Sequence, residues 1–443
     1  MRTAALHNLG CKVNSYETEA MQQLLEEAGY EIVPFHEKAD VYIINTCSVT
    51  NIADRKSRQM LHRAKKQNPD AVVVAAGCYV QAAAEELKAD LAVDVIIGNN
   101  KKQDLLPILE EYFKDKSDSS HVIEISETHE YERLSIHKIA DHTRAFLKIQ
   151  DGCNQFCSYC IIPYTRGRVR SRRPDEVVAE VRELAAAGYQ EVVLTGIHLS
   201  SYGVDFKEEE KKENLLSLIK QVHEVEGIRR IRLGSLEPRI ITEEFAQALA
   251  SMPKFCPHFH LSLQSGCDKT LKRMNRHYTT EEYAAGCEIL RRYFDNPAIT
   301  TDVIVGFPGE TEEEFEETKA FLERIGFYEM HIFKYSRRAG TRADRMPDQI
   351  PEQVKSVRSE ILLKLEKQMS KAYRESFSGK KKTVLLEEKT EIGGRAYMIG
   401  DTMEYVKAVV PYADNLKNKM TEGILKEALN DEVLLLDSRN FLN

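Results

Sequence analysis

The chain has 443 residues, 42% of them hydrophobic and 30% charged, which is typical of a soluble globular protein with about three domains. Its formal net charge of −8 argues against broad non-specific nucleic-acid binding, which requires neutralisation of phosphates. It contains no apolar run long enough for a membrane span and no signal-peptide core, so we expect no membrane association and a cytoplasmic location.

Residues 1–115 alternate between strand and helix patterns. Apolar strands are expected at 3–6, 41–44, 71–76 and 95–97, with helical patterns between them. Such alternation predicts a parallel sheet whose faces are covered by helices.

Three cysteines follow three of these strands directly: Cys11, Cys47 and Cys78. The carboxyl ends of parallel strands share one edge, where open α/β sheets bind ligands, so the fold should bring the three thiols together. In a chain without an export signal, clustered cysteines are more often metal ligands than disulfides. Cysteine is also a common small buried residue, but the repeated topological position favours a ligand site.

A polar connection at about 115–142 leads into a second segment, 140–375. Six strand patterns separated by helical patterns predict an open, partial (β/α)6 barrel, which carries its chemistry on the loops at the carboxyl ends of its strands. The expected strands are 145–149, 191–194, 230–233, 258–263, 301–305 and 329–334.

The loop after the first of these strands carries Cys153, Cys157 and Cys160 in a C-x3-C-x2-C spacing. Soft thiolates bind zinc or iron–sulfur clusters. Structural zinc needs four protein ligands, and no fourth Cys or His follows at the usual short interval. A 4Fe–4S cluster held by three thiolates leaves one iron open. That iron suits the amino and carboxylate groups of S-adenosylmethionine, whose reductive cleavage yields a radical that an enclosing barrel protects.

Residues 376–443, after a helical pattern at 351–377, have a different character. Five short strands punctuated by Gly, Asp and Asn predict a small closed β-barrel, an architecture often used to bind RNA. A purely structural cap is the alternative, because barrels host many unrelated functions. The expected strands are 383–387, 395–399, 405–410, 423–427 and 432–436.

The cysteine motif after a first barrel strand, with Tyr159 before its last cysteine, resembles the radical S-adenosylmethionine superfamily. Leu9-Gly10-Cys11, Asn45-Thr46-Cys47 and Ala76-Gly77-Cys78 are similar to the auxiliary-cluster domain of the methylthiotransferases, and the five-stranded tail resembles their RNA-binding TRAM domain. The stretches 153–163 and 194–198 look most like the bacterial members that act on N6-threonylcarbamoyladenosine in tRNA. The resemblance spans essentially the whole chain.

This resemblance implies two 4Fe–4S clusters, one on Cys153, Cys157 and Cys160 and one on Cys11, Cys47 and Cys78. It also implies methylthiolation at C2 of the modified adenosine next to the anticodon. In the family, one S-adenosylmethionine methylates a sulfur carried by the second cluster, and another yields the radical that abstracts the C2 hydrogen. The implied partners are the tRNA anticodon stem-loop and an electron donor such as flavodoxin or ferredoxin. The sulfur donor is not implied.

Further residues are expected around the cofactor and the substrate. Polar loop-end residues and one aromatic are expected to contact S-adenosylmethionine: Tyr159, Glu237, Gln264 and Ser265. Three arginines are expected to bind phosphate or the threonylcarbamoyl carboxylate through their fork geometry: Arg166, Arg168 and Arg170. The remaining thiols, Cys256, Cys267 and Cys287, are expected to be structural.

Two other functions compete with this hypothesis. The same radical chemistry would serve isopentenyladenosine in tRNA or an aspartate of a ribosomal protein. From another class, the chain would be a non-catalytic iron–sulfur protein that binds RNA or carries electrons. Six strand–helix units around a three-thiol motif argue against that last possibility.

Overall fold

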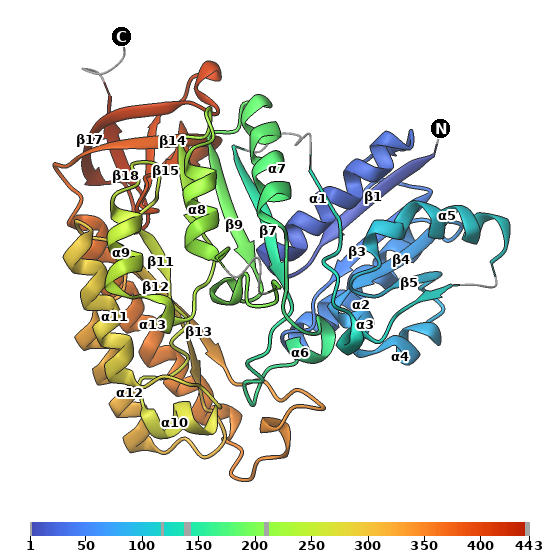
Figure 1. Ribbon diagram of the computed structural model, residues 1–443, viewed down its shortest axis with the longest axis horizontal. Helices are drawn as coiled ribbons and strands as arrows, with labels where there is room; N and C mark the ends of the chain where they lie inside the picture. The colour runs from blue at the N-terminus through green and yellow to red at the C-terminus, as the bar shows by residue number, and fades with distance from the viewer. Residues whose placement is uncertain (1, 117–118, 137–142, 208–211, 439–443) are drawn as a thin grey trace.

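The computed structural model describes residues 2–116, 119–136, 143–207 and 212–438. In chain order it consists of a parallel sheet, an open half-barrel of strands and helices, one long helix and a closed β-barrel (Figure 1). None of the helices in the described ranges combines the length and apolar character needed to cross a lipid bilayer.

The N-terminal sheet has the strand order β2-β1-β3-β4-β5-β6, and every neighbouring pair is parallel. Its central strands are buried along their whole length, because helices cover both faces and each face has its own apolar core. The strands are β1 (Thr3–Asn8), β2 (Glu31–Ile32), β3 (Val41–Thr46), β4 (Val72–Gly77), β5 (Val95–Ile97) and β6 (Ser120–His121). The helices are α1 (Lys12–Glu27), α2 (Asn51–Gln67), α3 (Cys78–Ala82), α4 (Ala84–Lys88) and α5 (Leu105–Lys114).

The middle of the chain forms the half-barrel. Two sheets, parallel except for one short strand, are joined by parallel bridges between Ile231 and Phe255 and between Leu236 and Leu261. The strands are β7 (Arg144–Asp151), β9 (Glu191–Gly196), β10 (Arg230–Leu233), β11 (His258–His260), β12 (Ala298–Val305) and β13 (Glu329–Lys334), and the short β8 (Arg170–Ser171) pairs antiparallel with β7. The predicted α/β architecture with a partial barrel is confirmed.

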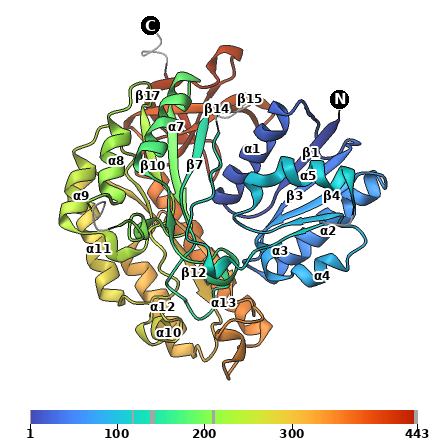
Figure 2. The same ribbon diagram turned by 45° about the vertical axis from the view of Figure 1, so that its right-hand side comes forward.

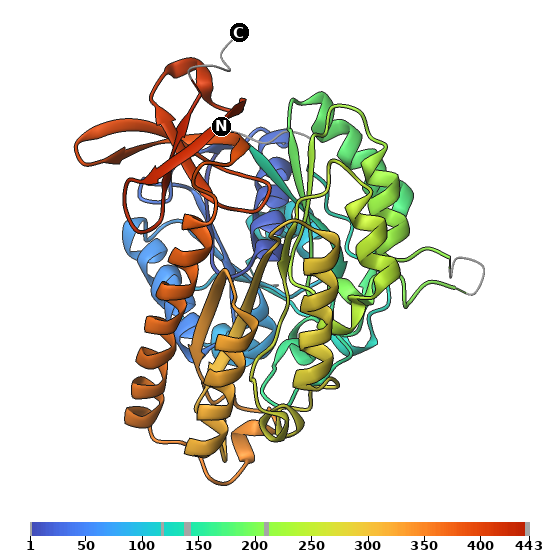
Figure 3. The same cartoon turned by 90° about the vertical axis from the view of Figure 1, so that its left-hand side faces the viewer.

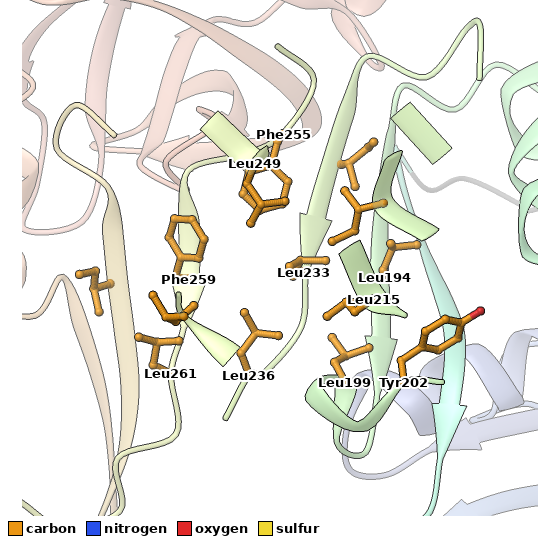
Figure 4. Close-up of a cluster of buried hydrophobic side chains, with 14 of the residues drawn as sticks. Leu194, Leu199, Tyr202, Leu215, Leu233, Leu236, Leu249, Phe255, Phe259 and Leu261 are labelled. Carbon is orange, nitrogen blue, oxygen red and sulfur yellow. The ribbon is translucent and has the colours of Figure 1, made fainter. Parts of the chain in front are cut away.

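Helices cover the outer side of the half-barrel. Leu194, Leu233, Phe259 and Leu261 point from the strands into the apolar core beneath these helices (Figure 4). Side chains alternate along a strand, so the neighbours of these residues face the concave side. The covering helices are α7 (Pro174–Ala186), α8 (Leu215–His223), α9 (Glu243–Ala250), α10 (Asp268–Arg273), α11 (Thr280–Tyr293) and α12 (Glu312–Ile325).

Helix α1 joins the N-terminal sheet to the half-barrel. It packs against β7 and β9 as well as against its own sheet (Figure 2). The start of α1, where Cys11 lies, is therefore next to the strands of the half-barrel.

The C-terminal barrel lies at the amino ends of the half-barrel strands (Figure 3). Arg230 donates to the backbone oxygens of Asp401 at 2.8 Å and Thr383 at 2.7 Å, and Arg144 pairs with Glu387 at 2.8 Å. The barrel follows α13 (Glu352–Glu375) and closes in the order β14-β15-β16-β18-β17. Its strands are β14 (Lys381–Ile392), β15 (Arg395–Asp401), β16 (Lys407–Pro411), β17 (Met420–Ala428) and β18 (Leu434–Asp437), which confirms the predicted five-stranded domain.

Candidate functional site

Cys11, Cys47 and Cys78 lie at the carboxyl edge of the N-terminal sheet. Thr46 pairs with Gly77, so the two cysteines that follow them leave the sheet at the same level. Gly10 has a φ of +110°, and a Cβ there would lie 2.9 Å from both Cβ and Sγ of Cys47. Only glycine therefore lets the Cys11 segment approach Cys47 this closely.

Cys78 receives hydrogen bonds from a cation and an amide. Arg166 Nε lies 3.2 Å and Asn99 Nδ2 3.6 Å from Cys78 Sγ. Burial, with the nearby Cys78 adding to it, raises the pKa of Cys47 to about 12. A metal bound at this site would have to displace the thiol proton.

Arg166 is the centre of a buried ionic network. Its Nη1 lies 2.8 Å from Glu17 and 3.1 Å from Asp151. Lys148 bonds the same two carboxylates at 2.8 and 2.7 Å. Burial alone would raise the pKa of Glu17, but Arg166, Lys102 and Lys148 hold it well below its usual range. Arg166 therefore keeps a fixed charge beside Cys78.

The second triplet, Cys153, Cys157 and Cys160, lies in the loop after β7. Phe156 within the loop has a φ of +49°, and Asn275 Nδ2 donates to its backbone oxygen at 3.1 Å. The segment after α10 thus holds the loop from outside.

Arg276 contacts this second triplet and carried no signal in the sequence. Its Nη1 donates to Cys157 Sγ at 3.3 Å, and the guanidinium is fixed by Ser262 O at 3.3 Å and Tyr278 Oη at 3.0 Å. A single arginine 119 positions away along the chain forms no local pattern. Burial raises the pKa of Cys153 to about 11.

One short segment connects the two triplets. Arg166 bonds both Cys78 and Asp151, and Asp151 lies two positions before Cys153. Gly167, the residue after Arg166, accepts a hydrogen bond from the Cys153 N–H at 3.0 Å. Three free thiols with cationic donors fit a 4Fe–4S cluster at each triplet, because cysteine thiolates hold such clusters and hydrogen bonds tune them.

Two of the predicted cofactor contacts, Tyr159 and Glu237, are each held by a side chain of another loop. Tyr159, within the motif, is half-buried and packs edge-on against Phe307 at 6.4 Å between ring centres. Glu237, after β10, accepts a hydrogen bond from Arg239 Nε at 2.7 Å, and Ser200 Oγ accepts from its backbone N–H at 2.9 Å.

The other two are held by neighbouring elements. Gln264 has a φ of +72° and bonds β12 through its backbone, to Asp302 O at 2.8 Å. Ser265 is buried, and its hydroxyl lies 3.2 Å from Thr318 Oγ1 of α12. The Ser265 hydroxyl is therefore engaged between the strand loop and the helix.

The three predicted substrate arginines have different surroundings. Arg166 and Arg170 are fully buried, and Arg170 Nη1 donates to the backbone oxygens of Arg166 at 2.9 Å and Arg168 at 3.2 Å. Arg168 is exposed, with its guanidinium 4.7 Å from the centre of the Phe156 ring. Only Arg168 of the three presents its charge to solvent.

Cys256, Cys267 and Cys287 are free and buried. Cys287 packs in the core under the helices, and Cys267 Sγ lies 3.2 Å from a carboxylate oxygen of Glu317.

Two family models match the chain. Residues 147–322 match the radical SAM superfamily, and residues 3–98 match a family described as uncharacterized protein family UPF0004. The two matches fall on the half-barrel and on the N-terminal sheet, which carry one cysteine triplet each.

Curated relatives match nearly the whole chain. The threonylcarbamoyladenosine tRNA methylthiotransferase MtaB of Bacillus subtilis is 43% identical over 95% of this chain and 93% of its own. The tRNA-2-methylthio-N(6)-dimethylallyladenosine synthase of Moorella thermoacetica is 38% identical over 87% of each chain. Among solved structures, the radical S-adenosylmethionine methyltransferase TsrM of Kitasatospora setae has a TM-score of 0.58 at 18% identity, covering 77% of each chain. That likeness concerns the fold alone. By its curated relatives, this chain belongs to the radical S-adenosylmethionine methylthiotransferase family.

Proposed function

We propose that this enzyme converts N6-threonylcarbamoyladenosine next to the anticodon of tRNA into its 2-methylthio derivative. The observation that carries the proposal is the pair of cysteine triplets joined through Arg166. Relatives named for this reaction, at 43% and 42% identity, support the choice of substrate.

The cofactors that this family implies are S-adenosylmethionine and two 4Fe–4S clusters, which would supply the radical and carry the sulfur. We assign Cys153, Cys157 and Cys160 to one cluster and Cys11, Cys47 and Cys78 to the other. Arg276 and Arg166 would each offset thiolate charge by hydrogen bonding. Tyr159, Glu237 and Gln264 would orient S-adenosylmethionine, and the strands around them would exclude water.

The partners follow from the same reasoning. We assign residues 1–115 to the auxiliary-cluster domain, 140–375 to the radical core and 376–443 to a TRAM domain that binds the tRNA. Exposed Arg168 is the candidate for a backbone phosphate. An electron donor such as flavodoxin or ferredoxin is required to reduce the cluster, and the reducing cytoplasm suits so many free thiols.

A second candidate substrate is isopentenyladenosine in tRNA. Relatives named for dimethylallyladenosine, at 37% and 38% identity, support it slightly less than the first. The two substrates differ at N6, where one carries a charged amino-acid group and the other an apolar group.

The decisive test is an anaerobic reaction of the reconstituted full chain with dithionite, S-adenosylmethionine and a source of sulfide. Anticodon stem-loops carrying either modified adenosine are offered separately, and nucleosides are identified by mass spectrometry. We expect 5′-deoxyadenosine and the 2-methylthio product from the threonylcarbamoyl stem-loop only. Product from the isopentenyl stem-loop alone would contradict the proposal.

The iron content of cysteine variants tests which triplet holds which cluster. Replacing Cys11, Cys47 and Cys78 by alanine should remove about four iron atoms per chain and leave 5′-deoxyadenosine formation intact. Replacing Cys153, Cys157 and Cys160 should also remove about four but abolish 5′-deoxyadenosine. A matched Cys287→Ala variant should keep all the iron, because that thiol packs in the helix core.

A further inference from the structure

Lys12 is a cation without a protein counter-ion. It is the first residue of α1, directly after Cys11. Its Nζ lies 5.9 Å from the centre of the ring of Phe146 on β7. Within the described part of the chain, no carboxylate is close enough to form an ion pair with Nζ, and it donates no hydrogen bond.

Phe146 places Lys12 on the concave side of the half-barrel. Its neighbours on β7, Ala145 and Leu147, belong to the core under the outer helices, so Phe146 faces the other way. Lys148, two residues after Phe146 on β7, faces the same side and pairs with Glu17 of α1 at 2.8 Å. Phe146 is half-buried and offers an apolar surface beside the ammonium group.

The charges around Lys12 leave a positive excess. Arg232 and Arg144 lie close enough to repel its charge, and Glu191 close enough to attract it. Glu191 is already paired with Arg232 at 2.8 Å and with Arg230 at 3.7 Å.

The other acids of this region are also engaged. Arg144 forms ion pairs with Glu387 at 2.8 Å and with Asp401 at 3.2 Å. Within this group of described residues, four cations share three carboxylates. The cations are Lys12, Arg144, Arg230 and Arg232, and the carboxylates are those of Glu191, Glu387 and Asp401. A partly buried cation left without a partner is costly, so the arrangement is suited to an anionic ligand.

The proposed substrate carries such an anion. The threonylcarbamoyl group ends in a carboxylate, and the N–H of its threonine can donate to N1 of the adenine. That internal hydrogen bond folds the threonyl part toward the N1 side of the base, beside C2. C2 is the atom that would receive sulfur from the cluster on Cys11, Cys47 and Cys78, and Lys12 follows Cys11 in the chain.

We infer that Lys12 is the receptor for the carboxylate of the threonylcarbamoyl group, an assignment that rests on the proposed function. The ammonium and carboxylate form a charge-assisted hydrogen bond away from bulk water. An isopentenyl group has no charge to offer and would leave Lys12 unpaired. Lys12 would thus distinguish the two N6 substituents.

The test compares binding of three stem-loops to the full chain with both clusters assembled, under anaerobic conditions. They carry threonylcarbamoyladenosine, its methyl ester and unmodified adenosine at the same position. Wild type should bind the acid about tenfold more tightly than the ester, because a hydrogen bond to a charged group contributes about 1.5 kcal/mol. Lys12→Met should bind acid and ester alike, and Lys12→Arg should keep part of the preference. Fluorescence anisotropy gives the dissociation constants.

The controls separate this inference from the function on which it rests. Lys364→Met, an exposed residue of α13, should keep the preference for the acid. Equal binding of acid and ester by wild type, or the same preference in Lys12→Met, would overturn the role of Lys12. If Lys12→Met lost the same affinity for the unmodified stem-loop as for the acid, Lys12 would bind a phosphate instead. If Lys12→Met lost iron, Lys12 would support the cluster instead. Either outcome would reject the role of carboxylate receptor. Failure of wild type to methylthiolate the threonylcarbamoyl stem-loop would instead reject the proposed function.

Discussion

Arg166 donates a hydrogen bond from Nε to Sγ of Cys78 at 3.2 Å, although the two residues are 88 positions apart in the chain. The same guanidinium pairs with Glu17 from α1 and Asp151 from β7. One buried side chain thus serves the thiol, the N-terminal sheet and the half-barrel together.

Replacing Arg166 by methionine should destabilise the protein and remove the iron that we assign to Cys11, Cys47 and Cys78. Glu17 and Asp151 would lose a buried partner, and breaking such a pair costs about 3–5 kcal/mol. Thermal unfolding and iron content measure the two effects. Arg168→Met, which removes an exposed arginine two positions away, should leave both unchanged. If Arg166→Met unfolds like wild type, the network does not stabilise the fold.

Replacing Arg276 by methionine should lower the midpoint potential of the cluster that we assign to Cys153, Cys157 and Cys160. A cationic donor to a ligand sulfur stabilises the more negative, reduced state. A lost interaction of about 1 kcal/mol corresponds to roughly 40–50 mV for one electron. An anaerobic redox titration followed by electron paramagnetic resonance gives the potential. Arg292→Met, an exposed residue of α11, is the control, and an unchanged potential in Arg276→Met would show that Arg276 has no electrostatic effect on the cluster.

Gly10→Ala should disrupt the triplet of Cys11, Cys47 and Cys78. Its Cβ would lie 2.9 Å from Cys47 Sγ, and its φ of +110° disfavours any side chain. Gly29→Ala is a matched control, because Gly29 has a φ of +83° and nothing within 4 Å of the added Cβ. The control should lose about 1 kcal/mol of stability but no iron, whereas Gly10→Ala should lose about four iron atoms per chain. Equal iron contents would contradict a requirement for close approach at Gly10.

The contact between the C-terminal barrel and the half-barrel should weaken as pH rises. Burial, with the nearby Asp401 and Glu191 adding to it and Arg144 opposing it, raises the pKa of Glu387 from 4.5 to about 7. Because the folded pKa is the higher one, stability is fully present below pH 4.5 and falls until about pH 7.

Glu387→Gln removes this titration. In denaturant titrations, the free energy of unfolding of the variant should match that of wild type near pH 4.5. At pH 8 it should exceed the wild-type value by roughly 1–3 kcal/mol. Glu388→Gln, its exposed neighbour, should follow the wild-type profile. Parallel profiles for Glu387→Gln and wild type would show that Glu387 does not titrate with a raised pKa.

The alternation of strands and helices made the fold and the meeting of the first three cysteines predictable. Each cysteine follows a strand, and parallel register places such positions on one edge, as the pairing of Thr46 with Gly77 illustrates. Local sequence carried that information. The C-x3-C-x2-C motif was local in the same sense.

Contacts between distant segments were not predictable in this way. The run containing Arg166 and Arg170 has the pattern of a solvated basic track, yet both side chains are buried, because acids from α1 and β7 surround them. The polar composition around residue 130 predicted an irregular connection, and residues 128–136 form no helix or strand. The composition did not predict that Leu134 and Ile136 of this stretch lie in the main core. Burial of charge depends on partners that no local window contains.

The ionic network around Arg166 also limits how the enzyme moves. Swinging the N-terminal sheet and α1 away from the half-barrel would separate Glu17 from Arg166 and Lys148, at a cost of several kcal/mol. Such an opening would be rarely populated at equilibrium. The distance between the two cysteine triplets is therefore expected to stay constant through turnover. The two S-adenosylmethionine molecules would then have to bind and leave one after the other without domain movement. The tRNA base would be the part that moves into and out of the site.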